Sequence, residues 1–375
     1  MTAVEDSFSA ADEAAMRQAL KLAEQAIGLS DPNPRVGCVI LAPDGRLLGA
    51  GHTQAAGQAH AEIMALRDAQ TRGEDVRGAT AYVTLEPCAH HGRTPPCCDA
   101  LIAAGLGRVV AALGDPNPQV SGQGMARLQA AGIRTSLGLL AVPARELNIG
   151  FFSRMLRGRP FVRMKIAASL DGRTALPDGR SQWITAEPAR RDGHAWRRRA
   201  GALLTGIGTV REDDPRLDVR WVPTQRQPLR VIVDSRLETP PGARILQPPG
   251  QVLIYAAQDA AERARALRAT GAEIVLLPDP SGKVDLAALM HDLGGRGINE
   301  LHVEAGHKLN GSLLRAGLVD EFLIYLAPKL LGQGREMAAF GPLDSLDEAP
   351  QLLWREIAPV GEDLRLIARP RGWAL

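Results

Sequence analysis

The chain has 375 residues, of which 45% are hydrophobic and 23% are charged, so two or three domains with ample apolar cores are expected. Its formal net charge of +2 argues against a nucleic-acid surface, which would need a far more basic domain with clustered Lys and Arg. No segment approaches the ~18 apolar residues of a membrane span, and residues 1–10 have neither a basic start nor an apolar core. We therefore expect no membrane anchor and no signal peptide.

The four cysteines, Cys38, Cys88, Cys97 and Cys98, all lie in the first 98 residues. This distribution is not a disulfide framework for a protein of this size, and reduced thiols are typical of the cytoplasm. Cys38 lies inside the apolar run of residues 36–41, and we expect both Cys38 and Cys98 to be small buried hydrophobic side chains.

A histidine, a glutamate and the other two cysteines form the most informative pattern. His60 and Glu62 are two residues apart, Cys88 follows an expected strand over residues 81–85, and Cys97 opens an expected helix over residues 98–104. The N-terminal dipole of that helix favours a thiolate at Cys97. His60, Cys88 and Cys97 are a ligand set for a catalytic zinc ion, with a fourth position left for water.

Zinc lowers the pKa of its bound water from ~15.7 to ~7, which makes hydroxide available for attack on an amidine-like ring carbon. Glu62 stands where the H-x-E signature of zinc deaminases has its proton shuttle. Taken alone, Glu62 would read as an ordinary surface residue near a core histidine. The joint pattern favours the catalytic interpretation.

The second half of the chain alternates apolar runs with helical patterns. Strands are expected over residues 202–205, 229–233, 252–255, 273–277 and 300–304, and a helix over residues 259–267. Such alternation predicts a mostly parallel sheet. Residues 206–211 are a weak nucleotide signal because Arg211 stands where a third glycine would complete the fingerprint. Residues 304–314, a strand followed by a glycine turn and a helix start, fit either a phosphate site or a purely structural turn.

We place the domain boundary near residues 148–152, before the basic Gly/Pro-containing stretch of residues 157–160. The predicted architecture is therefore α/β with two domains, a zinc-dependent deaminase domain over residues 1–150 and a second domain over residues 151–375.

The spacing between Cys88 and Cys97 departs from the usual P-C-x-x-C of deaminases, because eight residues separate the two thiols. The whole string TLEPCAHHGRTPPCC (residues 84–98), together with NPRVG (33–37) and DPNP (115–118), resembles the deaminase half of the bifunctional riboflavin-biosynthesis deaminase/reductase family. This resemblance implies a cytidine-deaminase-like zinc domain. It also implies that the pyrimidine substrate contacts Asn33, His52, His90 and Arg93.

Each of these four residues also has a simpler interpretation. Asn33 lies in a Pro-Asn-Pro turn that needs no ligand, and His52 fits a surface position after Gly51. Arg93 is the one that we expect to bind phosphate, since it stands in a rigid Pro-rich loop beside the expected metal. Glu86, before the Pro-Cys turn, is expected to shape the metal loop by hydrogen bonding and not to act in catalysis.

Four further strings resemble the reductase half of the same family: MKIAASLDGRT (164–174), SQWIT (181–185), GIGTV with DDPRL (206–217) and APKLLG (327–332). The resemblance implies a dihydrofolate-reductase-like domain that uses NADPH. The positions that it implies for cofactor contact are Ala167, Trp183, Thr209, Asp213, Ser235, Gly306, His307, Lys308, Leu309, Asn310, Gly311 and Ser312. Those that it implies for the sugar phosphate are Lys165, Ser181, Arg197, Leu217, Arg220 and Glu304. The sequence does not decide whether Lys165 or Glu304 assists hydride transfer.

The resemblance as a whole implies a cytoplasmic enzyme for consecutive steps of riboflavin synthesis, with zinc and NADPH as cofactors. It would deaminate a phosphorylated diaminopyrimidinone to the corresponding uracil and then reduce the ribosyl chain to ribityl. We expect small phosphorylated pyrimidines as its partners, no nucleic acid, no membrane, and a homo-oligomer (dimer or tetramer). Two other hypotheses are a nucleotide or tRNA deaminase with a merely binding second domain, and a noncatalytic zinc-stabilised nucleotide-binding protein.

Overall fold

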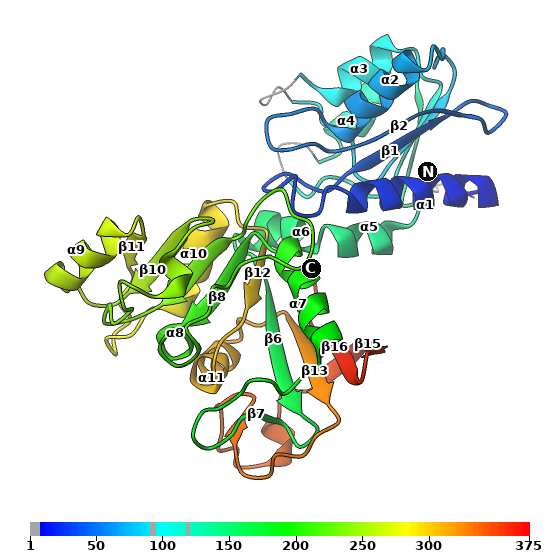
Figure 1. Ribbon diagram of the computed structural model, residues 1–375. Coiled ribbons are helices and arrows are strands. Elements are labelled where there is room, and N and C mark those ends of the chain that lie inside the picture. The colour runs from blue at the N-terminus through cyan, green and yellow to red at the C-terminus, as the bar shows by residue number, and fades with distance from the viewer. Residues whose placement is uncertain (1–7, 91–94, 118–120) are drawn as a thin grey trace. The chain divides into compact units, whose positions relative to one another are not determined.

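The computed structural model describes residues 8–90, 95–117 and 121–375, and it divides into two compact units between Arg157 and Gly158 (Figure 1). The division falls at the end of helix α6 (Ile149–Arg157), whereas the sequence placed it at residues 150/151. Phe151 and Phe152 are buried, Arg145 of the same unit lies over the Phe152 ring, and Gly158, with a φ of 66°, follows the helix end.

The first unit is a five-stranded sheet between two layers of helices, with strand order β2-β1-β3-β4-β5. Strands β3, β4 and β5 are parallel, and β1 pairs antiparallel with β2 and β3. The strands are β1 (Gly37–Leu41), β2 (Leu47–His52), β3 (Thr80–Val83), β4 (Arg108–Ala111) and β5 (Arg134–Leu137). The helices are α1 (Ala10–Glu24), α2 (Ala61–Thr71), α3 (Cys97–Ala103), α4 (Gln123–Ala130), α5 (Ala141–Leu147) and α6. Helices α1 and α5 cover one face of the sheet, and α2, α3 and α4 cover the other (Figure 1).

Glycines at two strand positions let helices approach this sheet closely. A Cβ atom at Gly37 would lie 1.9 Å from the carbonyl oxygen of Ala19 in α1, and one at Gly49 would lie 2.2 Å from that of Ala65 in α2. Helix α2 therefore rests directly on β2, and its N-terminus, which carries His60 and Glu62, is fixed beside the sheet.

The second unit is built on a nine-stranded sheet with the order β11-β10-β9-β8-β12-β6-β13-β16-β15. Neighbours from β11 to β13 are parallel, and β16 and β15 add an antiparallel edge. The strands are β6 (Phe161–Ser169), β8 (Ala202–Gly206), β9 (Leu229–Val233), β10 (Val252–Ala256), β11 (Glu273–Leu276), β12 (Glu300–Val303), β13 (Glu321–Ala327), β15 (Leu352–Val360) and β16 (Asp363–Pro370); β7 (Arg173–Ala175) and β14 (Arg335–Glu336) pair separately.

Helices and buried side chains cover both faces of this sheet. The helices are α7 (Glu187–Arg199), α8 (Ile207–Asp213), α9 (Ala261–Ala269), α10 (Leu286–Gly295) and α11 (His307–Arg315), with short 3₁₀ turns at Arg244–Leu246 and Leu346–Glu348. Leu203 and Leu204, neighbours in β8, are both fully buried but belong to different core clusters. This two-sided burial explains why the strands read as continuous apolar runs.

The predicted strands of the second unit are confirmed to within two residues at their ends, and so is the predicted helix over residues 259–267, now α9. The sheet is mostly parallel, as expected. The antiparallel edge formed by β15 and β16 was not predicted as secondary structure.

Candidate functional sites

The first unit gathers the three predicted zinc ligands at two helix starts and one strand end. His60 is the N-cap residue of α2, Cys97 is the first residue of α3, and Cys88 lies in the loop after β3. The Nδ1 atom of His60 is 3.6 Å from Sγ of Cys88 and 3.3 Å from Sγ of Cys97, and the three ligand atoms all lie within 4.8 Å of one another. One imidazole and two thiols at this separation fit a zinc ion with a free coordination position.

Local hydrogen bonds favour a thiolate at Cys88 and not at Cys97, where the helix dipole was expected to favour one. The hydrogen bond with Cys88 and burial raise the pKa of the Cys97 thiol well above its usual range. The backbone N–H of Cys97 donates to Sγ of Cys88 over 3.3 Å, and the pKa of the Cys88 thiol is lowered to about 4, mainly by hydrogen bonding from Cys97. The neighbouring Cys98 is oriented differently, because its thiol donates to the carbonyl of Pro87. Cys38 and Cys98 are fully buried, as predicted.

Glu62 lies in the first turn of α2 and is only 4% exposed. Burial raises the pKa of its carboxyl to about 7, and the negative charge of Cys88 adds to the shift. A carboxyl group with such a pKa can both accept and give up a proton near neutrality.

Glu86 has the structural role that the sequence suggested. Its carboxylate accepts hydrogen bonds from the backbone N–H groups of Asp115, Gly122, Gly124 and Met125, at 2.9 to 3.3 Å. These bonds connect the loop that carries Cys88 to the end of β4 and the start of α4, so the carboxylate is fully engaged in holding the metal loop.

A cavity of about 400 Å³ lies beside these residues, and His60, Glu62 and Cys88 line it. Of the predicted substrate contacts, Asn33 and His90 also line the cavity, whereas His52, the last residue of β2, does not. Arg93 lies outside the described residues.

Several lining residues were not predicted as site residues, among them Asp115, Asn117, Phe151, Arg154 and Met155. Asp115 and Asn117 follow the buried strand β4 and belong to the DPNP motif (residues 115–118) that resembles the deaminase family. Both features could have identified them as site residues from the sequence. The other three lie on α6, which the expected division at residues 150/151 splits.

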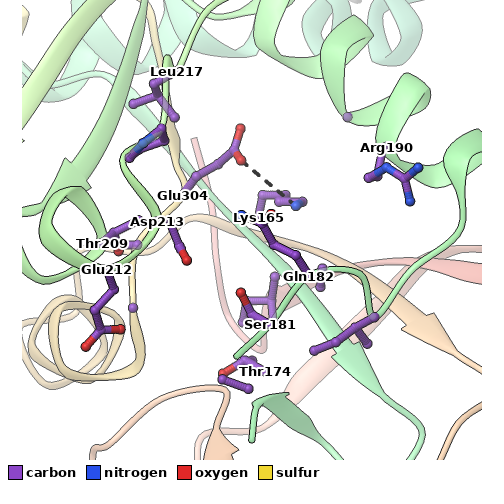
Figure 2. Close-up of a pocket in the computed structure, with 18 of the residues that line it drawn as sticks. Lys165, Thr174, Ser181, Gln182, Arg190, Thr209, Glu212, Asp213, Leu217 and Glu304 are labelled. Carbon is purple, nitrogen blue, oxygen red and sulfur yellow. Dashed lines mark ion pairs between the residues drawn. The ribbon is translucent and has the colours of Figure 1, made fainter. Parts of the chain in front are cut away.

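The second unit has its own cavity, of about 480 Å³. Val303 of β12 pairs with Met164 of β6, so the next residues of the two strands, Glu304 and Lys165, lie side by side. Figure 2 shows their side chains pointing toward each other, with Nζ and Oε2 3.9 Å apart. Arg197 of α7 binds both oxygens of Glu304, with Nη2 2.9 Å from Oε2.

This ion-pair cluster sets the charge states of its members. Burial alone would raise the pKa of Glu304, but Arg197 and Lys165 outweigh it and hold this pKa well below its usual range. Burial lowers the pKa of Lys165 against the opposing charge of Glu304, and the charge of Arg197 acts in the same direction as burial. The lowered pKa favours the carboxylate form of Glu304, so Lys165 is the member of the pair that can donate a proton.

The cavity brings together most of the residues predicted for this half. All six predicted sugar-phosphate contacts line it: Lys165, Ser181, Arg197, Leu217, Arg220 and Glu304. Of the predicted cofactor contacts, the lining residues are Ala167, Trp183, Thr209, Asp213, Gly306, His307 and Asn310. Ser181, Thr209 and Asp213 surround the same space as Lys165 in Figure 2.

The remaining predicted cofactor contacts, Ser235, Lys308, Leu309, Gly311 and Ser312, do not line the cavity. The hydroxyl of Ser235 accepts the N–H of Val284, and a Cβ atom at Gly311 would lie 2.0 Å from the carbonyl oxygen of Ala339. Consecutive residues of a helix point in different directions, so α11 presents only His307 and Asn310 to the cavity.

Additional cations line this cavity that the motifs did not single out: Arg190, Arg216, Arg244 and Arg335. Arg190 lies 4.6 Å from the ring centre of Trp183, a cation–π contact. His194 is buried in the same wall, and burial together with Arg197 and Arg220 lowers its pKa to about 4. The walls thus combine several arginines with a stacking surface, which suits anionic ligands.

Two protein-family models match the chain. The cytidine and deoxycytidylate deaminase zinc-binding region matches residues 9–113, and the RibD C-terminal domain matches residues 160–366. These two regions contain most of the residues that line the two cavities, including every predicted ligand of the metal site.

Full-length relatives cover nearly the whole chain. The riboflavin biosynthesis protein RibD of Escherichia coli is 50% identical over 369 residues, which are 95% of this chain and 98% of that protein. A structure of Acinetobacter baumannii RibD superposes with a TM-score of 0.87 at 40% identity, covering 96% of this chain and 99% of the other. A Thermotoga maritima diaminohydroxyphosphoribosylaminopyrimidine deaminase/5-amino-6-(5-phosphoribosylamino)uracil reductase gives the same TM-score and the same coverage at 34% identity.

Among the described residues, none of the helices combines the length and the apolar character that crossing a membrane requires.

Proposed function

Because the chain belongs to the RibD family of riboflavin biosynthesis proteins, we propose that it catalyses two consecutive reactions. The first is the hydrolytic deamination of 2,5-diamino-6-(5-phosphoribosylamino)pyrimidin-4(3H)-one to 5-amino-6-(5-phosphoribosylamino)uracil. The second is the NADPH-dependent reduction of the ribosyl chain to ribityl. The observation that carries the proposal is that each unit contains one cavity with the groups that one of these reactions needs.

In the deaminase cavity, His60, Cys88 and Cys97 are the residues that would hold zinc. A zinc ion at this position supplies a water molecule acidic enough to attack the ring near neutral pH. The carboxyl of Glu62 takes a proton from that water, passes it to the ring nitrogen and later protonates the departing amine. Its pKa of about 7 suits both directions of transfer.

Asn33 and His90 line the same cavity, and we assign them to the polar edge of the pyrimidine. The predicted substrate contact of His52 stays a prediction, because His52 is not among the residues that line the cavity; its carbonyl accepts a hydrogen bond from Gln54.

In the reductase cavity, NADPH supplies the hydride for the sugar carbon. The ammonium of Lys165 polarises the C1 centre of the sugar and gives its proton to the oxygen that was part of the ring. Glu304 is held as a carboxylate by Arg197, so it acts by orienting Lys165 and not as an acid. The arginines of the cavity bind the phosphate groups of cofactor and substrate.

A coupled assay on zinc-loaded protein tests this proposal. Ammonia release and loss of NADPH absorbance are followed together, with the diaminopyrimidinone ribosyl phosphate as substrate and Glu62→Gln as the variant. We expect the variant to lose about 10²- to 10⁴-fold in deamination rate, to retain its zinc, and to oxidise NADPH normally when the deaminated uracil is supplied.

The other outcomes separate the competing hypotheses. Ammonia release without NADPH oxidation would remove the reductase assignment. If neither signal appears, nucleosides, deoxycytidylate and tRNA are the next substrates to test. A Glu62→Gln protein with unchanged cellular function would favour the noncatalytic, zinc-stabilised alternative.

We further propose a cytoplasmic homo-oligomer. Supporting the location, all four cysteines are free thiols, as expected in a reducing compartment. Supporting the assembly, β15 is an edge strand that exposes Trp354 and Ile357, and large apolar side chains on an open sheet edge favour association. Light scattering after size exclusion measures the oligomeric state directly.

A further inference from the structure

The loop of residues 181–185, between β7 and α7, forms one edge of the reductase cavity. All five of its residues line the cavity. Its largest side chain, Trp183, is 61% exposed, so packing in the hydrophobic core does not hold the indole ring in place. The position of this ring therefore depends on how the backbone of the loop is held.

Two cationic side chains hold the backbone carbonyls of three successive loop residues. Nζ of Lys329 donates to the carbonyl of Ile184 over 2.8 Å and to that of Trp183 over 3.3 Å. Nη1 of Arg190 donates to the carbonyl of Thr185 over 2.7 Å, and its guanidinium carbon lies 4.6 Å from the ring centre of Trp183. Because both donors are charged, these hydrogen bonds are stronger than those between neutral groups.

Lys329 connects the loop to the two central strands of the sheet. It follows the end of β13 by two residues, and its own carbonyl accepts the backbone N–H of Leu170, directly after β6, over 2.8 Å. The last residues of these strands, Ala327 and Ser169, pair with each other. Strand β6 also carries Lys165, so Lys329 fixes the loop in relation to the residue that acts on the sugar.

We propose that Lys329 is a positioning residue for the cofactor, because it holds the backbone at Trp183 and Ile184 so that the indole ring is presented to NADPH. Lys329 is not among the residues that line the cavity, so it acts through Trp183. Without this hydrogen bonding the loop has more conformations, and NADPH binding must order it at a cost in affinity. The inference rests on the proposed reductase function and on the cofactor contact of Trp183 that the family resemblance implies.

The test measures NADPH affinity and turnover separately on the full-length protein. For Lys329→Met, the Kd of NADPH, followed by the fluorescence of its nicotinamide, should rise about tenfold, which is the scale of one hydrogen bond from a charged donor. At saturating NADPH, kcat for reduction of the deaminated uracil should stay within about twofold of the wild-type value, because the substitution leaves Lys165 and Glu304 in place.

A double-substitution cycle shows whether Lys329 acts through Trp183. Trp183→Ala alone should raise the Kd of NADPH. Adding Lys329→Met to Trp183→Ala should raise it further by less than about twofold, since the loop then has no indole ring to position.

Two single substitutions are the controls. Lys329→Arg keeps charged N–H donors at this position and should retain most of the NADPH affinity. Lys283→Met removes the same charge from an exposed turn of the second unit and should leave the Kd of NADPH unchanged. Deamination, a reaction of the first unit, should be the same in all of these variants.

Three outcomes would overturn the proposal while leaving the reductase function intact: an unchanged Kd in Lys329→Met, a loss of kcat with no change in Kd, or effects of Lys329→Met and Trp183→Ala that multiply. The last would mean that Lys329 affects the cofactor independently of Trp183. If the wild type neither binds NADPH nor oxidises it with the deaminated uracil, the reductase function fails and the inference fails with it.

Discussion

Glu62 and Glu304 are both carboxylates in the wall of a cavity, yet their pKa values move in opposite directions. Burial raises the pKa of Glu62 to about 7, and the negative charge of Cys88 adds to the effect. The pKa of Glu304 falls well below its usual range because Arg197 and Lys165 outweigh the effect of burial. The neighbours, more than the burial, decide whether a glutamate moves protons or holds another side chain in place.

The two cavities also differ in the charge of the residues that line them. The deaminase cavity is acidic and is built around a metal site, and its one described arginine comes from α6. The reductase cavity has Arg190, Arg197, Arg216 and Arg220 among its lining residues. The reductase cavity would hold two phosphorylated ligands, a cofactor and a sugar phosphate, and several arginines suit that load of negative charge.

The largest effect is expected from a substitution that removes a metal ligand and leaves the arginine-rich reductase cavity, here called the cationic site, intact. Cys97→Ser should lose its zinc and with it essentially all deamination, because serine is a poor zinc ligand at neutral pH. NADPH oxidation with the deaminated uracil should be unaffected. Metal analysis and the two activities, measured on one preparation, check both expectations.

The adjacent Cys98→Ser is the matched control for that substitution. Cys98 donates its thiol hydrogen to the carbonyl of Pro87, and a serine hydroxyl can do the same, so zinc and activity should be retained. Equal zinc loss in both variants would mean that the loop depends on thiol packing and not on ligation by Cys97.

The metal site could be predicted from the sequence because its ligands lie close together in the chain and are residue types that bind zinc. His60 with Glu62, and Cys88 with Cys97, come from two short segments, and each residue type has few other reasons to recur in that pattern. The strand that precedes Cys88 and the helix that begins at Cys97 were also predicted, from an apolar run and a helical run.

The cationic site could be predicted only through family resemblance. Lys165, Arg197 and Glu304 come from β6, from α7 and from the end of β12, and nothing in their local sequence says that they meet. Strand register brings Glu304 beside Lys165, and register is a property of the assembled sheet. Arg154 was missed for a different reason: the expected division at residues 150/151 separated it from the cavity that it lines, whereas the first unit extends to Arg157.

A second pair of substitutions separates structure from catalysis within the cationic site. Glu304→Gln leaves Lys165 without its counter-charge and leaves Arg197 with Asp218 alone, and it should cost about 3–5 kcal/mol in the free energy of unfolding of the second unit. Lys165→Met should cost less stability, because Glu304 keeps Arg197, but it should lower the rate of NADPH oxidation about 10²- to 10³-fold. Denaturant titration and steady-state kinetics measure the two effects.

Glu187→Gln controls for the charge change of Glu304→Gln. Glu187 pairs with Arg191 at 3.1 Å on the exposed surface of α7, where such a pair contributes less than about 0.5 kcal/mol. Similar losses from both substitutions would contradict the view that the buried ion pair organises the reductase cavity.

The smallest expected effect concerns His194, whose pKa is lowered to about 4 from 6.5 by burial and by the charges of Arg197 and Arg220, against the smaller opposing effects of Glu304 and Asp218. Its Nδ1 accepts the backbone N–H of Arg220 and its ring packs on Trp221, so a proton on that nitrogen would remove an acceptor. Below about pH 6.5 the unfolded chain binds a proton that the folded chain excludes. The stability contributed by neutral His194 is therefore complete above pH 6.5 and is lost as the pH falls toward 4.

His194→Asn tests this contribution, because its amide oxygen can accept the same hydrogen bond without titrating. Between pH 7.5 and 5.0, the wild type should lose about 1–2 kcal/mol more unfolding free energy than the variant. Parallel pH profiles for the two proteins would contradict the assignment and would place the acid sensitivity of this unit elsewhere. His194 lies in the second unit, so His194→Asn should leave the deamination catalysed by the first unit unchanged at both pH values. Any acid sensitivity of deamination then arises in the deaminase cavity.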